Sequence, residues 1–279
     1  MNLYPIAAGN FKLDGGAMFG VVPKSIWNKL NPADENNMCS WAMRCLLVED
    51  GNQLILIDNG MGDKQDEKFF SHYYLHGDED LDISLARHGF TRDDISDVFL
   101  THLHFDHCGG SIIRNGDRLI PAFKNARYWS NESHWKWATL PNAREKASFL
   151  KENIIPISES GQLHMIEEKQ GISFSENISV HFVYGHTDAM MLPVINYKGR
   201  KVVFMADLLP SVAHIPLPYV MAYDTRPLET LKEKKAFLEQ ALEERYVLFF
   251  EHDAVTECCT LEATEKGIRS ADRFRLEDL

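Results

Sequence analysis

Short apolar runs recur along the chain, and each one stops at a polar segment. Four runs rich in β-branched and aromatic residues cover 98–100, 180–183, 202–205 and 247–250. Runs of this length and composition predict buried strands. Amphipathic segments stand between them, the longest from Arg226 to about Glu244, where Pro227 fits the first helical turn because its missing N–H is harmless there. This alternation predicts an α/β protein.

Local signals refine this pattern. Gly-containing turns between β runs predict two hairpins, at residues 45–58 and 194–205. Apolar spacing predicts short helices within 66–88, 133–137 and 143–151. The glycine-rich stretch 10–27 predicts a shaped loop between strands. No Pro/Ser-rich linker or repeat interrupts the 279 residues, so we expect one domain over residues 1–279.

Charge and cysteine usage narrow the class of protein. The formal net charge of −12 argues against a general nucleic-acid surface, because phosphate binding draws on clustered Lys and Arg. The five cysteines are irregularly spaced, as expected of reduced thiols in a cytoplasmic protein. No apolar run is long enough to span a bilayer, so we expect no membrane partner.

The stretch Thr101–Gly110 concentrates ligand chemistry. His102, His104, Asp106 and His107 fall within six residues, directly after the apolar run 98–100. Alternate side chains share a face in extended backbone, so His102 and His104 can point the same way while Asp106 and His107 follow in the turn. Imidazole nitrogen and carboxylate oxygen are ligands that zinc, iron and manganese accept. The competing interpretation is a polar loop that binds no metal.

This stretch resembles the HxHxDH signature of the metallo-β-lactamase superfamily. Three later segments are similar to that family's remaining ligand elements, Gly185-His186-Thr187, Ala206-Asp207 and Glu251-His252, and each closes an apolar run. The resemblance implies an αββα sandwich of two mixed sheets with outer helices. One departure is that Asp188-Ala189-Met190 replaces the Gly-His that follows the histidine in many relatives.

Carried over residue by residue, the resemblance implies two divalent metal ions. Zinc is the first expectation, and manganese, iron or cobalt would also suit these ligands. One ion would be held by His102, His104 and His186, the other by Asp106, His107 and His252, with Asp207 bridging them. A metal-bound hydroxide would then act as the nucleophile. Asp58 lies in a DxG-like turn and would orient a ligand histidine, with a simple turn-forming aspartate as the alternative.

The lactonase and phosphotriesterase branch of the superfamily is the nearest in pattern. The stretches 14–27 and 207–227 resemble its segments, which implies an apolar substrate pocket lined by Met18, Phe19, Phe105, Leu208 and Leu209. For Met18 and Phe19, ordinary core packing is the alternative. The candidate catalytic residues are Asp106 and Tyr223, whose phenol could donate to a carbonyl or leaving oxygen. A buried structural tyrosine is the alternative for Tyr223. For His214 we expect a surface or packing role without metal binding.

These features predict a hydrolase of a small-molecule lactone, carboxylic ester or phosphotriester, acting as a monomer or homodimer. One alternative is a glyoxalase II-like thioesterase or a metallo-phosphodiesterase. The other is a metal-binding protein without catalytic activity. Histidine at position 104 argues against a diiron redox enzyme, because redox relatives carry glutamate there.

Overall fold

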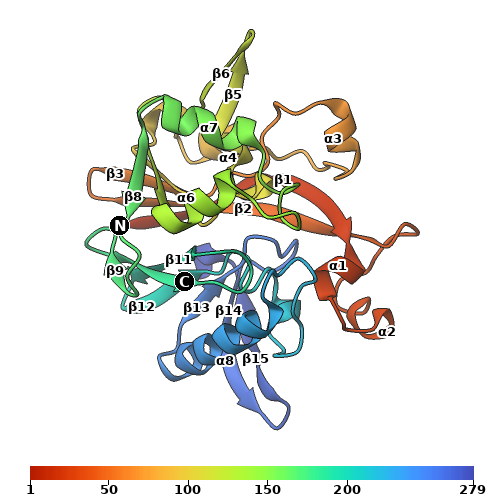
Figure 1. The fold of residues 1–279 in the computed structure, drawn as a ribbon. Helices are drawn as coiled ribbons and strands as arrows, with labels where there is room; N and C mark the ends of the chain where they lie inside the picture. The colour runs from red at the N-terminus through yellow and green to blue at the C-terminus, as the bar shows by residue number, and fades with distance from the viewer. The chain divides into compact units, whose positions relative to one another are not determined.

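A computed structural model describes all of residues 1–279, and its strands form two large sheets and one small one (Figure 1). The strands are β1 (Asn2–Asp14), β2 (Met38–Asp50), β3 (Gln53–Ile57), β4 (Asp97–Phe99), β5 (Ile112–Asn115), β6 (Arg118–Pro121), β7 (Arg127–Asn131), β8 (Leu163–Ile166), β9 (Ile172–Ser173), β10 (Ile178–Val183), β11 (Met190–Tyr197), β12 (Arg200–Phe204), β13 (Val247–Phe249), β14 (Cys258–Thr264) and β15 (Gly267–Phe274).

Most of the helices are short. They are α1 (Gly15–Phe19), α2 (Lys24–Trp27), α3 (Glu67–Ser71), α4 (Leu81–Arg87), α5 (Phe105–Cys108), α6 (Glu132–Thr139), α7 (Lys151–Glu159) and α8 (Pro227–Glu243). The 3₁₀ turns are η1 (Arg92–Asp94), η2 (Gly109–Ser111), η3 (Val212–His214) and η4 (Leu276–Asp278). None of the helices is long and apolar enough to cross a membrane.

The chain divides into two compact units. The first comprises Met1–Asn10 and Met43–Ile172, and the second comprises Phe11–Ala42 and Ser173–Leu279. The expectation of a single domain over residues 1–279 stays a prediction.

The first unit is built on a six-stranded sheet. Its strand order is β1-β2-β3-β4-β7-β8, with the β2–β3 pair antiparallel and the pairs β3–β4, β4–β7 and β7–β8 parallel. A fully buried apolar cluster that includes Leu47, Leu56 and Val98 forms its core. Since β3 and β4 are parallel, with Ile57 beside Phe99, the residues that follow both strands leave at the same edge of the sheet.

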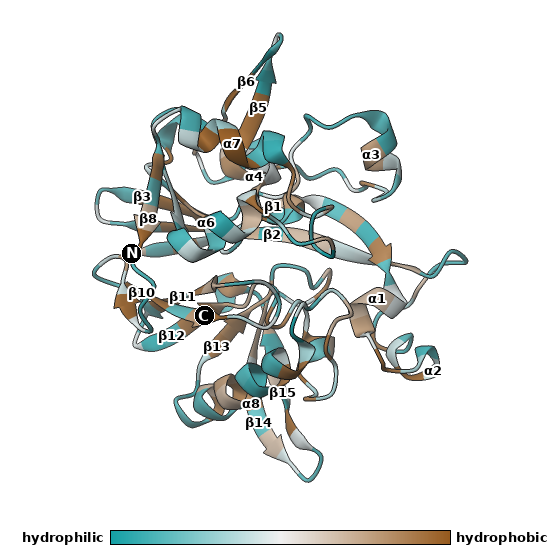
Figure 2. Cartoon of the chain, in the orientation of Figure 1, coloured by the Kyte–Doolittle hydropathy of each residue, from teal (hydrophilic) through white to brown (hydrophobic).

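The second unit is built on a seven-stranded sheet of order β15-β14-β13-β12-β11-β10-β9. The β12–β13 pair is parallel and places Phe204 beside Phe249, whereas β10–β11, β11–β12, β13–β14 and β14–β15 are antiparallel. Helix α8 packs against this sheet through one face, whose buried residues are Thr230, Lys234, Phe237, Leu238 and Ala241. Figure 2 shows hydrophobic residues on β13 and both hydrophobic and hydrophilic residues along α8, as expected of an amphipathic helix.

The predicted α/β class with mixed sheets is confirmed, and both predicted hairpins are present as β2–β3 and β11–β12. The predicted helix over 143–151 is wrong, because those residues form turns and α7 begins only at Lys151. Asn142 explains this, since its side-chain oxygen accepts from the N–H groups of Arg144 and Glu145 and so competes with a helical start. The prediction of a loop over 10–27 is wrong for most of this stretch, because residues 10–14 belong to β1 and two short helices, α1 and α2, follow.

Candidate metal centre

The edge of the first sheet at which β3 and β4 end carries the first set of candidate ligands. Asp58 follows β3, and its N–H donates to the Phe99 carbonyl at 2.9 Å. Its carboxylate accepts from the N–H of Thr101 at 2.8 Å and from the Thr101 hydroxyl at 2.6 Å. Asp58 is fully buried, so water does not compete for these hydrogen bonds. They fix the backbone at the start of the stretch Thr101–Gly110.

The imidazoles of His102 and His104 face each other across a short gap. His102 Nε2 lies 3.1 Å from His104 Nδ1, and both side chains are buried. Because the Thr101 hydroxyl donates to Asp58, its oxygen accepts from His102 Nδ1 at 3.1 Å, and this leaves the lone pair of His102 on Nε2. His104 Nε2 lies 3.4 Å from the Glu145 carboxylate. The facing nitrogens of His102 and His104 are close enough to share one cation.

Asp106 and His107 occupy the short helix α5, which directly follows His104. His107 Nδ1 donates to Asp58 Oδ2 at 3.1 Å, so its Nε2 carries the lone pair. That nitrogen lies 3.8 Å from Asp106 Oδ2. His107 is fully buried and Asp106 is 8% exposed. The pair therefore offers one imidazole nitrogen and one carboxylate oxygen that are almost inaccessible to bulk solvent.

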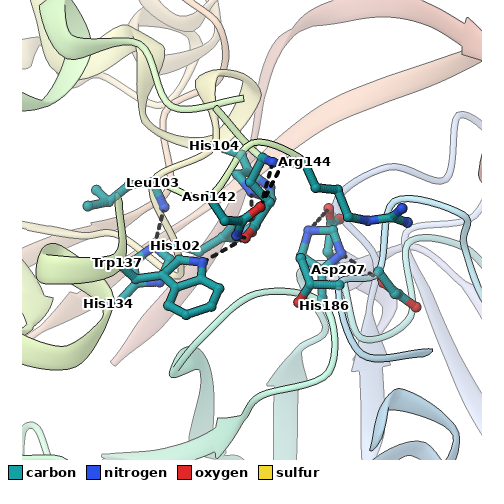
Figure 3. Close-up of polar contacts among 12 residues, drawn as sticks. His102, Leu103, His104, His134, Trp137, Asn142, Arg144, His186 and Asp207 are labelled. Carbon is teal, nitrogen blue, oxygen red and sulfur yellow. Dashed lines mark hydrogen bonds and ion pairs between the residues drawn. The ribbon is translucent and has the colours of Figure 1, made fainter. Parts of the chain in front are cut away.

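In the second unit, Asp207 lies between two histidines. One carboxylate oxygen lies 3.1 Å from His186 Nε2, and the other lies 3.1 Å from His252 Nε2 (Figure 3 shows the His186 contact). The parallel register of β12 and β13 explains how Asp207 and His252 meet, because each follows its strand by three residues at the same sheet edge. Each carboxylate oxygen of Asp207 therefore faces a different imidazole.

The other ring nitrogens of these histidines are held by acceptors. His186 Nδ1 lies 2.8 Å from a carboxylate oxygen of Asp224, and His252 Nδ1 lies 2.7 Å from the Ala42 carbonyl. Both arrangements place a proton on Nδ1, so Nε2 is the nitrogen that faces Asp207 and would bind a metal ion. Metal-binding histidines commonly have this pattern, in which a carboxylate or carbonyl fixes the ring.

Electrostatics at His186 favour positive charge. Burial alone would lower its pKa, but the carboxylates of Asp207 and Asp224 outweigh burial and raise the pKa to about 10. In the protein without metal this charge comes from a second proton on Nε2, which a metal ion would displace. The same two carboxylates would stabilise a divalent cation at Nε2.

Backbone strain accompanies two of these positions. Ala206, directly before Asp207, has φ of 40°, and Asp58 has φ of 55°. Residues other than glycine adopt this left-handed region at a cost of about 1–3 kcal/mol, and such strain clusters at functional sites. Both residues adopt this conformation just after the ends of strands, β3 and β12, that lead to candidate ligands.

Two glycines allow close approach beside the candidate ligands. A Cβ on Gly185 would lie 2.3 Å from the backbone nitrogen of Thr230, at the first turns of α8. A Cβ on Gly110 would lie 2.2 Å from the Asn59 carbonyl oxygen. Only glycine fits either position without displacing backbone.

The predicted pocket residues are mostly buried. Met18 is 1% exposed and Phe19 is fully buried, with the Phe19 ring stacked on Trp27 and on His214 at centroid distances of 5.5 and 4.6 Å. These are the contacts of core residues, which was the stated alternative. Leu208 and Leu209 are 3% and 0% exposed. A substrate contact for these four side chains stays a prediction.

The remaining predicted residues differ in exposure. Phe105 is 7% exposed and its ring lies 4.7 Å from that of Tyr73. Tyr223 is 40% exposed, so it is not the buried structural tyrosine of the alternative interpretation. His214 is buried, and burial lowers its pKa to about 3. Its Nε2 donates to the Met18 carbonyl at 2.9 Å, so its Nδ1 accepts from the Ser211 hydroxyl at 2.8 Å. Its contacts are those of a packing residue.

Several residues beside the ligands carried no signal in the sequence. Asp224 is 38 positions from His186, and Glu145 is 41 positions from His104. His134, held by the Asn131 cap of α6, accepts from the Leu103 N–H at 2.8 Å (Figure 3). An isolated Asp or Glu in a polar segment resembles ordinary surface, so only the fold reveals these contacts.

In each unit the candidate donors suit divalent metal ions of the zinc type. They are five imidazole nitrogens and two carboxylates in all, without thiolate, and acceptors orient four of the imidazoles through the nitrogen that would not bind metal. His102, His104, Asp106 and His107 come from the first unit. His186, Asp207 and His252 come from the second.

Curated relatives of this chain are lactonases. An N-acyl homoserine lactonase of Bacillus cereus is 29% identical over 157 residues, which is 52% of this chain and 58% of the relative. One from a Bacillus species is 27% identical over 155 residues, with the same shares. The match thus spans somewhat more than half the length of these relatives.

Solved structures match over nearly the whole chain. A probable metal-dependent hydrolase from Staphylococcus aureus is 28% identical with a TM-score of 0.89, covering 100% of this chain and 98% of that one. AidC, a dizinc quorum-quenching lactonase, is 21% identical with a TM-score of 0.78, covering 98% and 95%. The family model of the metallo-beta-lactamase superfamily matches residues 44–252, which include every candidate ligand. The protein therefore belongs to the metallo-beta-lactamase superfamily.

Proposed function

We propose that this protein is a dinuclear metal-dependent hydrolase that opens a lactone or cleaves a carboxylic ester. The observation that carries the proposal is the placement of Asp207, whose two oxygens each lie 3.1 Å from the Nε2 of a different histidine. Such a carboxylate suits a pair of cations better than a single one. The lactonase relatives make N-acyl homoserine lactones the first substrates to test.

The proposed ligand assignment uses both units. His102, His104 and His186 would bind one ion, Asp106, His107 and His252 the other, and Asp207 both. A centre shared by the two ligand sets is part of the proposal. When bound, a pair of divalent cations acidifies water and polarises the substrate carbonyl.

The chain's own residues then have separate tasks. Asp58, Asp224 and the Ala42 carbonyl hold the imidazoles of three ligands in the tautomer with a free Nε2. Tyr223, which is accessible, would donate its phenolic proton in a hydrogen bond to the carbonyl or leaving oxygen of the substrate. Asp106 would place its carboxylate next to the carbonyl and leaving oxygens of the substrate.

A neutral ester or lactone suits this site better than a polyanion. The chain carries a formal charge of −12, which disfavours the approach of nucleic acid. The phosphotriester and thioester classes enter the test as competing substrates. Binding of a small molecule needs no partner protein, and a monomer or a homodimer would serve equally.

The test combines metal content with a hydrolysis screen. We expect the purified protein to bind two divalent ions per chain and to hydrolyse N-hexanoyl-homoserine lactone or an aryl ester faster than a phosphotriester or a glutathione thioester. Metal removal and His104→Ala should each abolish turnover. Turnover that persists after both changes would contradict the proposal.

Metal stoichiometry tests whether the centre is shared. If the two ligand sets bind common ions, His104→Ala and His186→Ala should each lose the same ion, and Asp207→Ala should weaken both. If each unit binds metal by itself, His104→Ala would leave the metal of the second unit in place. The substitution Glu132→Gln, at an exposed residue, is the control for metal that is lost during purification.

A further inference from the structure

Glu145 is a buried carboxylate beside His104. It is 3% exposed, and His104 is 7% exposed. One carboxylate oxygen, Oε1, lies 3.4 Å from His104 Nε2. Glu145 belongs to the turn segment between α6 and α7, which also contacts the ligand stretch because the Ser148 carbonyl accepts from the Phe105 N–H at 3.0 Å.

The other oxygen of Glu145 is fixed by two donors. Trp137 Nε1 donates to Oε2 at 2.7 Å, and Asn142 Nδ2 donates to the same atom at 2.6 Å (Figure 3 labels both donors). The indole N–H can only donate. The Asn142 amide orientation is also determined, because its oxygen accepts from the N–H groups of Arg144 and Glu145 at 2.9 and 3.1 Å. Oε2 is therefore an acceptor of two hydrogen bonds.

This arrangement leaves Oε1 to face His104. A carboxylate oxygen accepts hydrogen bonds, so it favours the His104 tautomer that carries its proton on Nε2. The lone pair then lies on Nδ1, the nitrogen that is 3.1 Å from His102 Nε2. The ring of Phe149, at a centroid distance of 4.8 Å, packs against the same imidazole and restricts its rotation.

We propose that Glu145 is a positioning residue that holds His104 in the Nε2-protonated tautomer, so that Nδ1 is available to a metal ion. The inference rests on the proposed metal centre. It adds that the ability of His104 to bind a metal ion depends on a carboxylate 41 positions away in the sequence. Trp137 and Asn142 act by holding that carboxylate in place.

The substitution Glu145→Gln gives a specific test, because the amide has one oxygen and one NH₂ group. Trp137 and Asn142 both donate, so they select the amide oxygen for the Oε2 position and direct the NH₂ group at His104 Nε2. The amide would then donate to Nε2 and move the proton of His104 to Nδ1. That proton would bond to His102 Nε2 and occupy the place of the cation.

Three measurements test the effect of Glu145→Gln on His104 and on metal binding, and none of them needs a substrate. We expect imidazole ¹⁵N spectra of the metal-free protein to show His104 protonated at Nε2 in the wild type and at Nδ1 in Glu145→Gln. We expect competition with a zinc chelator to show about 10- to 100-fold weaker metal binding for the variant, the range for changes in residues that orient ligands. Thermal unfolding of the metal-free variant should match that of the wild type, since the substitution is nearly isosteric.

Control variants separate positioning from general damage. Glu132→Gln, an exposed change on α6, should alter none of the three readouts. Glu145→Ala removes the acceptor without adding a donor, so it should weaken metal binding without converting His104 fully to the Nδ1 tautomer. If Glu145→Gln does not fold, Glu145→Ala and the wild-type spectrum still test the inference.

Two results would overturn the proposal. One is a wild-type spectrum with the His104 proton on Nδ1, and the other is wild-type zinc affinity in Glu145→Gln. Failure of the proposed function has a different signature, because a protein that binds metal but hydrolyses no lactone or ester would leave the tautomer and affinity results unchanged.

Discussion

Asp224 offers a direct test of how the second unit prepares its ligands. The substitution Asp224→Asn keeps the shape of the side chain and removes its charge. In the structure this carboxylate is 1% exposed and lies 2.8 Å from His186 Nδ1. It therefore both orients the imidazole and increases the basicity of the opposite nitrogen.

The expected loss follows from this geometry. Removal of a carboxylate that orients a metal-binding histidine weakens metal affinity by about 10- to 100-fold, which is about 1.4–2.8 kcal/mol at 25 °C. The loss should fall in this range because the contact is short and buried, where solvent screens little. The hydrogen bond to an amide oxygen remains available, so we do not expect complete loss of metal.

The assay is competition with chelators of graded affinity, followed by metal analysis. Asp97→Asn is the matched control, because Asp97 is also fully buried and accepts from Trp129 Nε1 at 2.8 Å but contacts no candidate ligand. Asp97→Asn should reduce stability and leave metal affinity unchanged. If Asp224→Asn binds metal within twofold of the wild type while still folded, the argument that Asp224 prepares His186 is refuted.

Two further predictions concern stability. Gly185→Ala should lower the free energy of unfolding by about 3 kcal/mol or more, because its Cβ would lie 2.3 Å from the Thr230 backbone nitrogen. Gly51→Ala, with φ of +61° and open space around it, should cost only about 1 kcal/mol in the same denaturant titration, and equal losses would contradict the steric argument. Burial lowers the pKa of Lys234 to about 7 from its ordinary 10.5, so the unfolded chain binds more protons between these values and stability should rise with pH across that window. Lys234→Met should flatten this rise, measured as the difference in unfolding free energy between pH 7 and pH 10, and an unchanged slope would exclude Lys234 as its source.

The sequence predicted the strands because their apolar runs are short, β-branched and nearly continuous. Exposure of such runs to water costs the most free energy, so they are buried in the folded protein. The apolar residues predicted to form buried strands therefore are buried in β4, β10, β12 and β13. The predicted helix at 143–151 failed for the converse reason. Its apolar spacing favours a helix only slightly, and the hydrogen bonds that Asn142 and Glu145 make in the turn stabilise the turn more strongly.

The sequence by itself identified the candidate metal ligands, since three histidines and an aspartate within six residues, and single His or Asp residues at later strand ends, are visible in the chain. Only the tertiary structure decided how those side chains are held. Parallel strand pairing brings Asp58 to the ligand stretch and Asp207 to His252, and buried acceptors such as Asp224 and Glu145 select the tautomers. The reason is physical: a tautomer depends on a partner within about 3 Å in space, and chain folding sets that partner at sequence separations that no local pattern encodes.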